Sequence, residues 1–306
     1  MSTSTRTSKK TARRPGKSTE EKKAQAEALH NSISFQVEQL RDSDRWRAFL
    51  DFAQAFHRYS LNNLLLILSQ RPEAAQIAGF RKWAGLGRQV RRGETGIRIF
   101  GYSTKKVTEE DENGDDVEKR IARFPILNVF DIGQTDLIEG AEDPTTITRQ
   151  LTGTDDFGIV DALSTYLVEE GWTIQYRPLQ GQKNGYTDPE AMAVVIDTGL
   201  SPEHMAKTFI HETAHVLLGH TEDIAEYALH RGLMETEAES VAYVVAGLVG
   251  FDTSAYSVGY IAGWAEGDTD LIKSTAARVL HTVHQVATIL APDENEDKTA
   301  EEKDAA

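Results

Sequence analysis

The stretch SPEHMAKTFIHETAHVLLGH, residues 201–220, determines the character of the second half of this chain. Ser201 followed by proline is a strong helix start, because serine caps free backbone N–H groups and proline suits the first helical position. Further along, His211, Glu212 and His215 form the pattern H-E-x-x-H. Histidines four residues apart lie on one face of a helix and can bind one ion. The stretch therefore predicts a helix that carries a metal site.

The residues around this pattern favour a buried helix over an exposed one. Phe209, Ile210, Val216 and Leu217 flank the histidines. The alternative is a pair of surface histidines on a salt-bridged helix. Buried histidines and carboxylates need a partner, however, and a metal ion supplies one.

A third ligand is expected in LMETEAESVAYVV, residues 233–245, which reads as a helix. Glu235 is the predicted ligand, and Glu239 lies one turn later on the same face, where it could orient a ligand histidine. This E-x-x-x-E arrangement resembles the gluzincin pattern, and an exchange of roles between the two glutamates stays open. Glu237 lies about 160° from Glu239 on the helical wheel and is left out.

The metzincin pattern does not fit, because the positions of its glycine and third histidine are Leu218 and Thr221. His220 is one position early and is expected to cap the end of the helix, where a histidine suits the helix dipole. If Zn²⁺ binds, one coordination position stays open for water. Glu212 is then the predicted catalytic base, and the ion lowers the pKa of the water.

Composition restricts the possible environments of the chain. The 306 residues carry a formal net charge of −15, which disfavours indiscriminate binding to nucleic acid or anionic membrane. There is no cysteine, so disulfides and thiolate metal sites are excluded. The most apolar run, VAYVVAGLVGF at residues 241–251, is too short to span a bilayer. We expect a soluble, cytoplasmic protein without a membrane partner.

The pattern along the chain predicts an α+β protein with two domains and two tails. Residues 1–29 are basic and lack an apolar period, so they are expected to be a disordered tail. Residues 30–140 begin with helices and continue into a β-hairpin or small sheet. Residues 150–291 contain the H-E-x-x-H helix, preceded by the strand AMAVVID at 191–197. Residues 292–306 are expected to be a disordered acidic tail.

A basic and aromatic run at residues 79–106 suggests contact with nucleic acid. It holds eight lysines and arginines against one acid, with aromatic residues between them. Basic groups track phosphates and aromatic rings stack on unpaired bases, which suits single-stranded DNA. The alternative is that the aromatics are core residues and the arginines are merely solvated. The predicted DNA-binding residues are Tyr59, Asn62, Arg81, Lys82, Trp83, Arg88, Arg91, Arg92 and Arg98.

Three motifs of the first half carry a family resemblance. They are a helix start with Tyr59, Ser60 and Asn62, the turn GRQVRRGETG at 87–96, and the strand end FDIGQT at 130–135. Together they resemble the N-terminal single-stranded-DNA-binding domain of the ArdC antirestriction family. The second half resembles the zincin-like domain of ArdC proteins and of the ImmA/IrrE metallopeptidases. The resemblance covers roughly residues 45–265 and departs from many ArdC domains in the short segment between H-E-x-x-H and the third ligand.

The resemblance implies a mobile-element protein, of plasmid or phage type, that binds single-stranded DNA and protects incoming DNA from restriction. Its second domain would be a zinc-dependent, gluzincin-like peptidase with a protein substrate. One alternative is an ImmA/IrrE-like regulatory metallopeptidase that cleaves a repressor. Another is a DNA-binding module with a purely structural metal.

Overall fold

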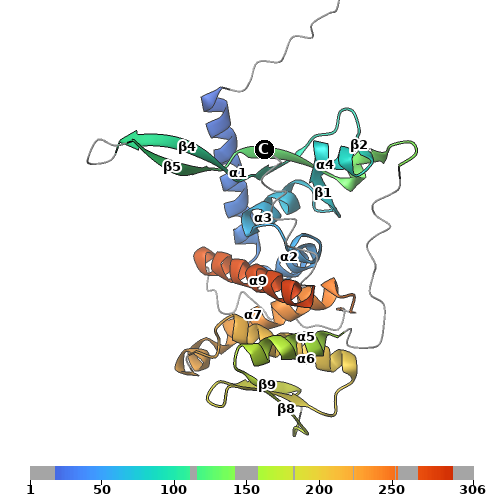
Figure 1. The fold of residues 1–306 in the computed structure, drawn as a ribbon, viewed down its shortest axis with the longest axis vertical. Helices are drawn as coiled ribbons and strands as arrows, with labels where there is room; N and C mark the ends of the chain where they lie inside the picture. The colour runs from blue at the N-terminus through green and yellow to red at the C-terminus, as the bar shows by residue number, and fades with distance from the viewer. Residues whose placement is uncertain are drawn as a thin grey trace, which may run out of the picture.

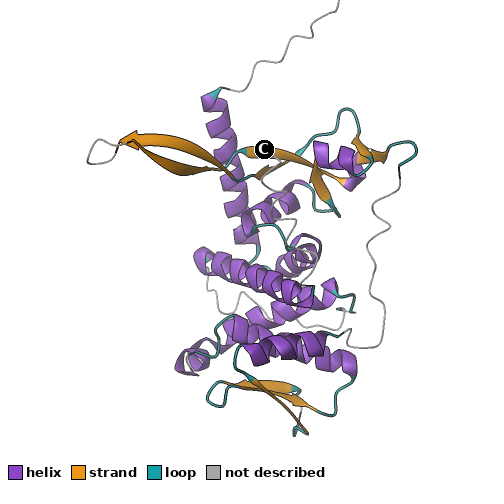
Figure 2. Cartoon of the chain, viewed as in Figure 1, coloured by secondary structure: helices purple, strands orange, loops and turns teal. Residues whose placement is uncertain are grey.

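The computed structural model describes residues 18–110, 116–141, 158–181, 183–222, 224–251, 253 and 268–291. Helices and small sheets make up these residues, which confirms the predicted α+β class (Figures 1 and 2). The predicted acidic tail at 292–306, most of the linker and the tip of the hairpin lie outside the described residues.

Three helices open the first half: α1 (Thr19–Gln39), α2 (Ser43–Phe56) and α3 (Leu61–Gln70). The helix α1 begins inside the segment that the sequence predicted as a disordered tail. Ser18 and Glu21 form a capping box that starts it, and Leu29 and Ile33 are buried along one side. The capping box and this apolar spacing outweigh the polar composition of the segment.

The strands of the first half form two small sheets and one protruding ribbon. Antiparallel pairing gives the order β1-β6-β3 in one sheet and β2-β7 in the other, with the short helix α4 between β1 and β2. The elements are β1 (Ile77–Gly79), α4 (Phe80–Gly85), β2 (Arg88–Val90), β3 (Ile97–Phe100), β6 (Ile126–Asp131), the 3-10 turn η1 (Ile132–Gln134) and β7 (Thr135–Leu137).

The predicted hairpin is confirmed, but it divides into two parts. Its base is the β3–β6 pair, and its outer part is the ribbon β4 (Ser103–Glu110) with β5 (Asp116–Arg123). Figure 1 shows this ribbon extending away from the rest of the chain. The rings of Tyr102 and Phe124 contact each other at the junction between the two parts, with centroids 5.8 Å apart and an angle of 59° between their planes.

The second half packs helices on one small sheet. Its strands follow the order β8-β10-β9, with β10 parallel to β8 and antiparallel to β9. The elements are α5 (Ile159–Glu169), β8 (Thr173–Arg177), β9 (Gly185–Asp188), β10 (Ala193–Asp197), α6 (Pro202–Leu217), α7 (Ile224–Leu248) and α9 (Thr269–Leu290). The helix α7 is kinked at His230.

One hydrophobic core runs through both halves. The helix α2 packs against α7, while α1 and α3 contact α9 (Figure 1). Arg41 donates a 2.7 Å hydrogen bond to Thr269, and the guanidinium of Arg47 lies 5.4 Å from the ring centre of Tyr243. No helix within the described residues is long and apolar enough to cross a membrane.

Candidate metal centre

The helix α6 forms as the sequence predicted, and the way it ends matters for the site. Ser201 caps its start by accepting from His204 N, and proline occupies the first turn. At its end Gly219 has a φ of 72°, the backbone N–H of Gly219 bonds to Val216 O, and that of His220 bonds to His215 O. This is a Schellman turn. It folds His220 back beside His215.

The helix places its two histidines together, and α7 supplies the third donor. The Nε2 atoms of His211 and His215 lie 3.1 Å apart. Glu235 Oε2 lies 3.5 Å from His211 Nε2 and 3.8 Å from His215 Nε2. One ligand atom from each of these residues lies within 4.8 Å of the others. The structure therefore brings the three predicted ligands together, although Glu235 lies twenty positions after His215 in the sequence.

Glu239 lies on the other side of the His211 ring. Its Oε2 is 3.2 Å from His211 Nδ1, and its Oε1 is 3.9 Å from Lys207 Nζ. A carboxylate on the far ring nitrogen orients a ligand histidine and fixes its tautomer. Glu235 thus faces the Nε2 atoms of both histidines and Glu239 the far side of His211, and the division of roles between them stays a prediction.

Glu212 is buried beside the cluster, and a threonine of β9 holds it. Thr187 Oγ1 donates a 2.8 Å hydrogen bond to Glu212 Oε2. Burial raises the pKa of Glu212, and the charge of His211 and the Thr187 hydrogen bond oppose that shift. A buried carboxyl group with a raised pKa is suited to accept and return a proton near neutral pH.

The two histidines differ in their proton affinity. Burial alone would lower the pKa of His211, but the carboxylates of Glu235 and Glu239 outweigh it and raise the pKa to about 10. Burial, together with the neighbouring charge of His211, lowers the pKa of His215 to about 3. The carboxylates of Glu235 and Glu239 thus favour a positive charge at His211, and a bound cation would take the place of the proton of His211.

A cavity of about 750 Å³ opens over the cluster. The strand β9 lines one side, and it is an edge strand, whereas β10 is central. The strand whose edge could align an extended peptide is therefore β9, because β10, which forms within the AMAVVID stretch, lies in the middle of the sheet. Gly185 lets β9 approach α6, because a Cβ there would lie 2.7 Å from Thr208 Cγ2. The rim also carries Lys183, Lys207 and Arg231.

For two residues beside the cluster, the structure differs from the expectation based on the sequence. The side chain of His220 was expected to cap α6, but only its backbone N–H does so. Its ring is buried between His215 and Glu237, at 3.0 Å from His215 Nδ1 and 2.9 Å from Glu237 Oε2. Glu237 was set aside because it faces away from Glu239, but this direction points it at His220. Only the packing of α6 on α7 reveals the contact.

The donor set fits a divalent metal ion. Two imidazole nitrogens and one carboxylate oxygen are the ligands of catalytic zinc sites that leave one position open. The donors converge without any basic side chain between them, and Lys207 and Arg231 contact the outer oxygens of Glu239 and Glu235 instead. Nothing in the donor chemistry distinguishes zinc from other divalent transition metals.

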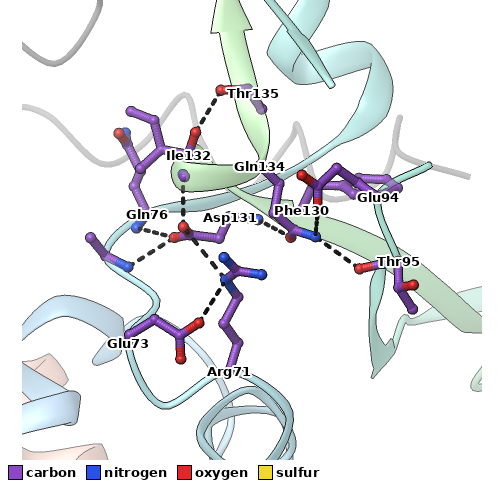
Figure 3. A network of polar contacts seen from close by, with 12 residues as sticks. Arg71, Glu73, Gln76, Glu94, Thr95, Phe130, Asp131, Ile132, Gln134 and Thr135 are labelled. Carbon is purple, nitrogen blue, oxygen red and sulfur yellow. Dashed lines mark hydrogen bonds and ion pairs between the residues drawn. The ribbon is translucent and has the colours of Figure 1, made fainter. Parts of the chain in front are cut away.

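In the first half, the residues of the turn and strand-end motifs form one polar network (Figure 3). Gln134 is buried and its amide donates to Glu94 Oε2 and Thr95 O, at 3.0 and 2.9 Å. Its carbonyl oxygen accepts from Asp131 N at 2.9 Å. Asp131 in turn accepts from the backbone of Ala75 at 2.9 Å. These motif residues hold the turn in place.

Several predicted DNA-binding residues are engaged inside this half. Trp83 is fully buried and its indole donates to Phe130 O at 2.8 Å, which leaves no ring face for a base. Arg91 pairs with Glu94 at 2.9 Å and with Asp136 at 3.3 Å, and these carboxylates raise its pKa. Arg88 donates to Thr135 at 2.8 Å. Burial of its ring argues against the predicted base contact of Trp83, whereas Arg91 is exposed and its guanidinium is already engaged by two carboxylates.

The remaining predicted residues are placed as follows. Tyr59 and Asn62 are partly buried, and it is Asn63 that docks α3 on β3 through two hydrogen bonds with Phe100. Exposed side chains are those of Arg81, Lys82, Arg92 and Arg98. The sequence did not single out Phe124, which forms an exposed aromatic pair with Tyr102.

Comparisons with known proteins agree with both halves of this structure. Residues 16–130 match the family model of the N-terminal domain of anti-restriction factor ArdC, and residues 169–246 match that of the IrrE N-terminal-like domain, a peptidase family. An uncharacterized protein of Bacillus anthracis is 27% identical over 276 residues, which are 78% of this chain and 45% of the relative. The chain thus spans about half the length of this curated relative.

Two crystal structures of the antirestriction protein ArdC from the R388 plasmid are also similar. The metal-free structure is 22% identical, with a TM-score of 0.46, and the match covers 76% of this chain and 84% of that one. The Mn(II)-bound structure is 20% identical, with a TM-score of 0.42, and the match covers 76% and 89%.

The fold and the two family matches define an α+β protein with an ArdC-type first half and a metallopeptidase-like second half. Residues 16–130 are thus similar to the ArdC N-terminal domain and residues 169–246 to the IrrE N-terminal-like domain, which confirms the predicted resemblance to ArdC-like antirestriction proteins.

Proposed function

We propose that the second half is a zinc-dependent peptidase domain. The observation that carries this proposal is the convergence of His211, His215 and Glu235 within 4.8 Å, at the floor of a cavity beside an edge strand. A bound ion would supply an acidic water and a positive charge next to a peptide carbonyl. Glu239 would hold His211 in the orientation that binding requires.

Glu212 would transfer the proton in this reaction, and β9 would bind the peptide. Glu212 accepts a proton from the attacking water and passes it to the leaving amine, and Thr187 holds its carboxylate at 2.8 Å. The free edge of β9 offers backbone N–H and C=O groups that would pair with an extended peptide. The basic rim residues Lys183 and Lys207 would favour substrates with acidic side chains.

The test compares the full chain with Glu212→Gln after loading with zinc. Zinc content by elemental analysis should be unchanged, and cleavage of a quenched fluorescent peptide library should fall at least about 100-fold. If the wild-type protein binds zinc and cleaves neither the library nor a candidate repressor, the peptidase proposal fails. The zinc would then have a structural role.

We further propose that the first half binds single-stranded DNA. Three aromatic side chains support this: Phe80, Tyr102 and Phe124 are 57%, 62% and 65% exposed. Bases stack on exposed aromatic rings of this kind. Arg123 is exposed directly before Phe124 in the chain, and Arg98 is exposed on β3. The ArdC family match supports an antirestriction role for this binding.

The DNA test uses matched substitutions of exposed residues. Tyr102→Ala should weaken binding to a single-stranded oligonucleotide by about 5- to 100-fold. Arg92→Ala should weaken it and reduce the slope of affinity against salt by roughly one unit. Tyr176→Ala and Arg177→Ala, which remove exposed residues of the second half, are the controls. Unchanged affinity in both first-half variants contradicts the proposal.

A further inference from the structure

A chain of buried polar groups leads from the metal cluster to the last helix. His215 Nδ1 lies 3.0 Å from His220 Nδ1, and His220 Nε2 lies 2.9 Å from Glu237 Oε2. Arg278 of α9 completes it, with Nη2 3.4 Å from Glu237 Oε2 and 2.7 Å from Leu218 O. The side chains of His220 and Glu237 are both 1% exposed, so water does not substitute for these contacts.

The direction of these hydrogen bonds follows from the groups at the two ends. A carboxylate accepts hydrogen bonds and does not donate them, so the hydrogen between His220 and Glu237 belongs to His220 Nε2. A neutral His220 with its proton on Nε2 has a lone pair on Nδ1. The hydrogen between the two Nδ1 atoms must then belong to His215.

That arrangement decides what His215 presents to the metal cluster. A neutral imidazole with a proton on Nδ1 has its lone pair on Nε2, the atom that faces His211 Nε2 at 3.1 Å and Glu235 Oε2 at 3.8 Å. The opposite tautomer would place an N–H at Nε2 and block coordination. The tautomer of His215 is thus determined at Glu237 and Arg278, which lie two and three contacts away from it.

We propose that His220 and Glu237 are positioning residues that keep the Nε2 lone pair of His215 directed at the metal. This inference rests on the proposed metal site. It adds a second orienting device on His215 to the one that Glu239 provides for His211. Each ligand histidine is then held by a carboxylate of α7, directly in one case and through His220 in the other.

Glu237→Leu is the sharpest substitution, because it removes the acceptor and puts an apolar side chain of similar size in its place. His220 Nε2 then has no carboxylate to donate to, so the His220 proton is no longer held on Nε2 and the lone pair of His215 is no longer held toward the metal. We expect the zinc dissociation constant of the full chain, measured by chelator competition, to rise about 10- to 100-fold. Glu169→Gln removes the same charge from an exposed site on α5 and should leave the constant unchanged.

His220→Asn and His220→Leu separate hydrogen bonding from packing. Asparagine can accept from His215 Nδ1 through its side-chain oxygen and should retain affinity within about threefold of wild type, whereas leucine should lose about 10- to 100-fold. In the His220→Asn background, Glu237→Leu should have little further effect, because no imidazole tautomer remains to be switched. The cobalt-substituted protein should show a changed visible spectrum in the leucine variant.

Nitrogen-15 NMR of the histidine rings tests the inference without any substitution. The zinc-loaded wild-type protein should show protons on His215 Nδ1 and His220 Nε2. A proton on His220 Nδ1 with a bare Nε2 overturns the proposal, and so does wild-type affinity in a folded Glu237→Leu protein. If the wild-type chain binds no divalent metal, the proposed metal site itself fails, which is a different outcome.

Discussion

The indole Nε1 of Trp46 donates a 3.1 Å hydrogen bond to the hydroxyl of Ser240. Both side chains are buried, and the bond joins α2 of the first half to α7, the helix that carries Glu235. The candidate DNA-binding half and the candidate metal centre therefore share one packed interface. A substitution that weakens this interface should therefore destabilise both the first half and the metal centre.

Ser240→Ala tests this coupling. The substitution leaves a buried indole N–H without its acceptor, which should lower the free energy of unfolding by about 1–3 kcal/mol. Urea unfolding followed by circular dichroism measures the change, and zinc release should follow the same transition. Ser274→Ala, at an exposed serine of α9, should have almost no effect. Separate transitions for the two probes would show that the halves unfold independently.

The second prediction concerns the buried glutamine of the first half. Gln134→Leu replaces the glutamine with an apolar side chain of similar size and removes its hydrogen bonds with Glu94, Thr95 and Asp131. We expect the free energy of unfolding to fall by at least about 2 kcal/mol, because the buried N–H of Asp131 and the partly buried acceptors of Glu94 and Thr95 lose their partner. Gln89→Leu, on an exposed position of β2, is the matched control. Equal stability of the two variants would contradict a structural role for the network in Figure 3.

The third prediction separates the two glutamates of α7. Glu235→Ala removes a proposed ligand, so zinc retained after dialysis should fall to background. Glu239→Ala removes only the group that orients His211, so zinc should still bind with about 10- to 100-fold lower affinity. Elemental analysis after dialysis against a weak chelator measures both. A larger loss of zinc in Glu239→Ala than in Glu235→Ala would make Glu239 the ligand and Glu235 the residue that orients a histidine.

The fourth prediction concerns pH and a histidine at the interface between the halves. His57 ends α2 and faces His284 of α9, with ring centroids 6.5 Å apart. Burial lowers its pKa below 6.5, and the charges of Arg58 and His284 add to the shift. The unfolded chain then binds the proton more readily than the folded one.

The free energy of unfolding should therefore be highest above pH 6.5 and fall as the pH drops below that value. Urea titrations between pH 5 and about 7.5 measure this slope. His57→Gln should flatten it, whereas His281→Gln, at an exposed position of α9, should preserve it. An unchanged slope in His57→Gln would assign the pH dependence to other groups.

Features that depend on neighbours in sequence were predictable from the sequence. The capped start of α6 and the i,i+4 spacing of His211 and His215 are local, so they follow from helix geometry alone. The same holds for the hairpin of the first half, whose strands alternate around a turn-rich tip. The capping box of Ser18 and Glu21 was equally local, but the basic composition around it concealed the start of α1.

Features that depend on packing were decided only by the tertiary structure. An aromatic residue type does not reveal whether it faces solvent, so Trp83 and Tyr102 could be told apart only by their burial. The contacts of His220 with Glu237 and of Trp46 with Ser240 join residues on different helices. Their distances are set by how α6, α7 and α2 pack. The sequence by itself determined which residues could bind a metal ion, and the packing of α7 against α6 decided which carboxylate faces each histidine.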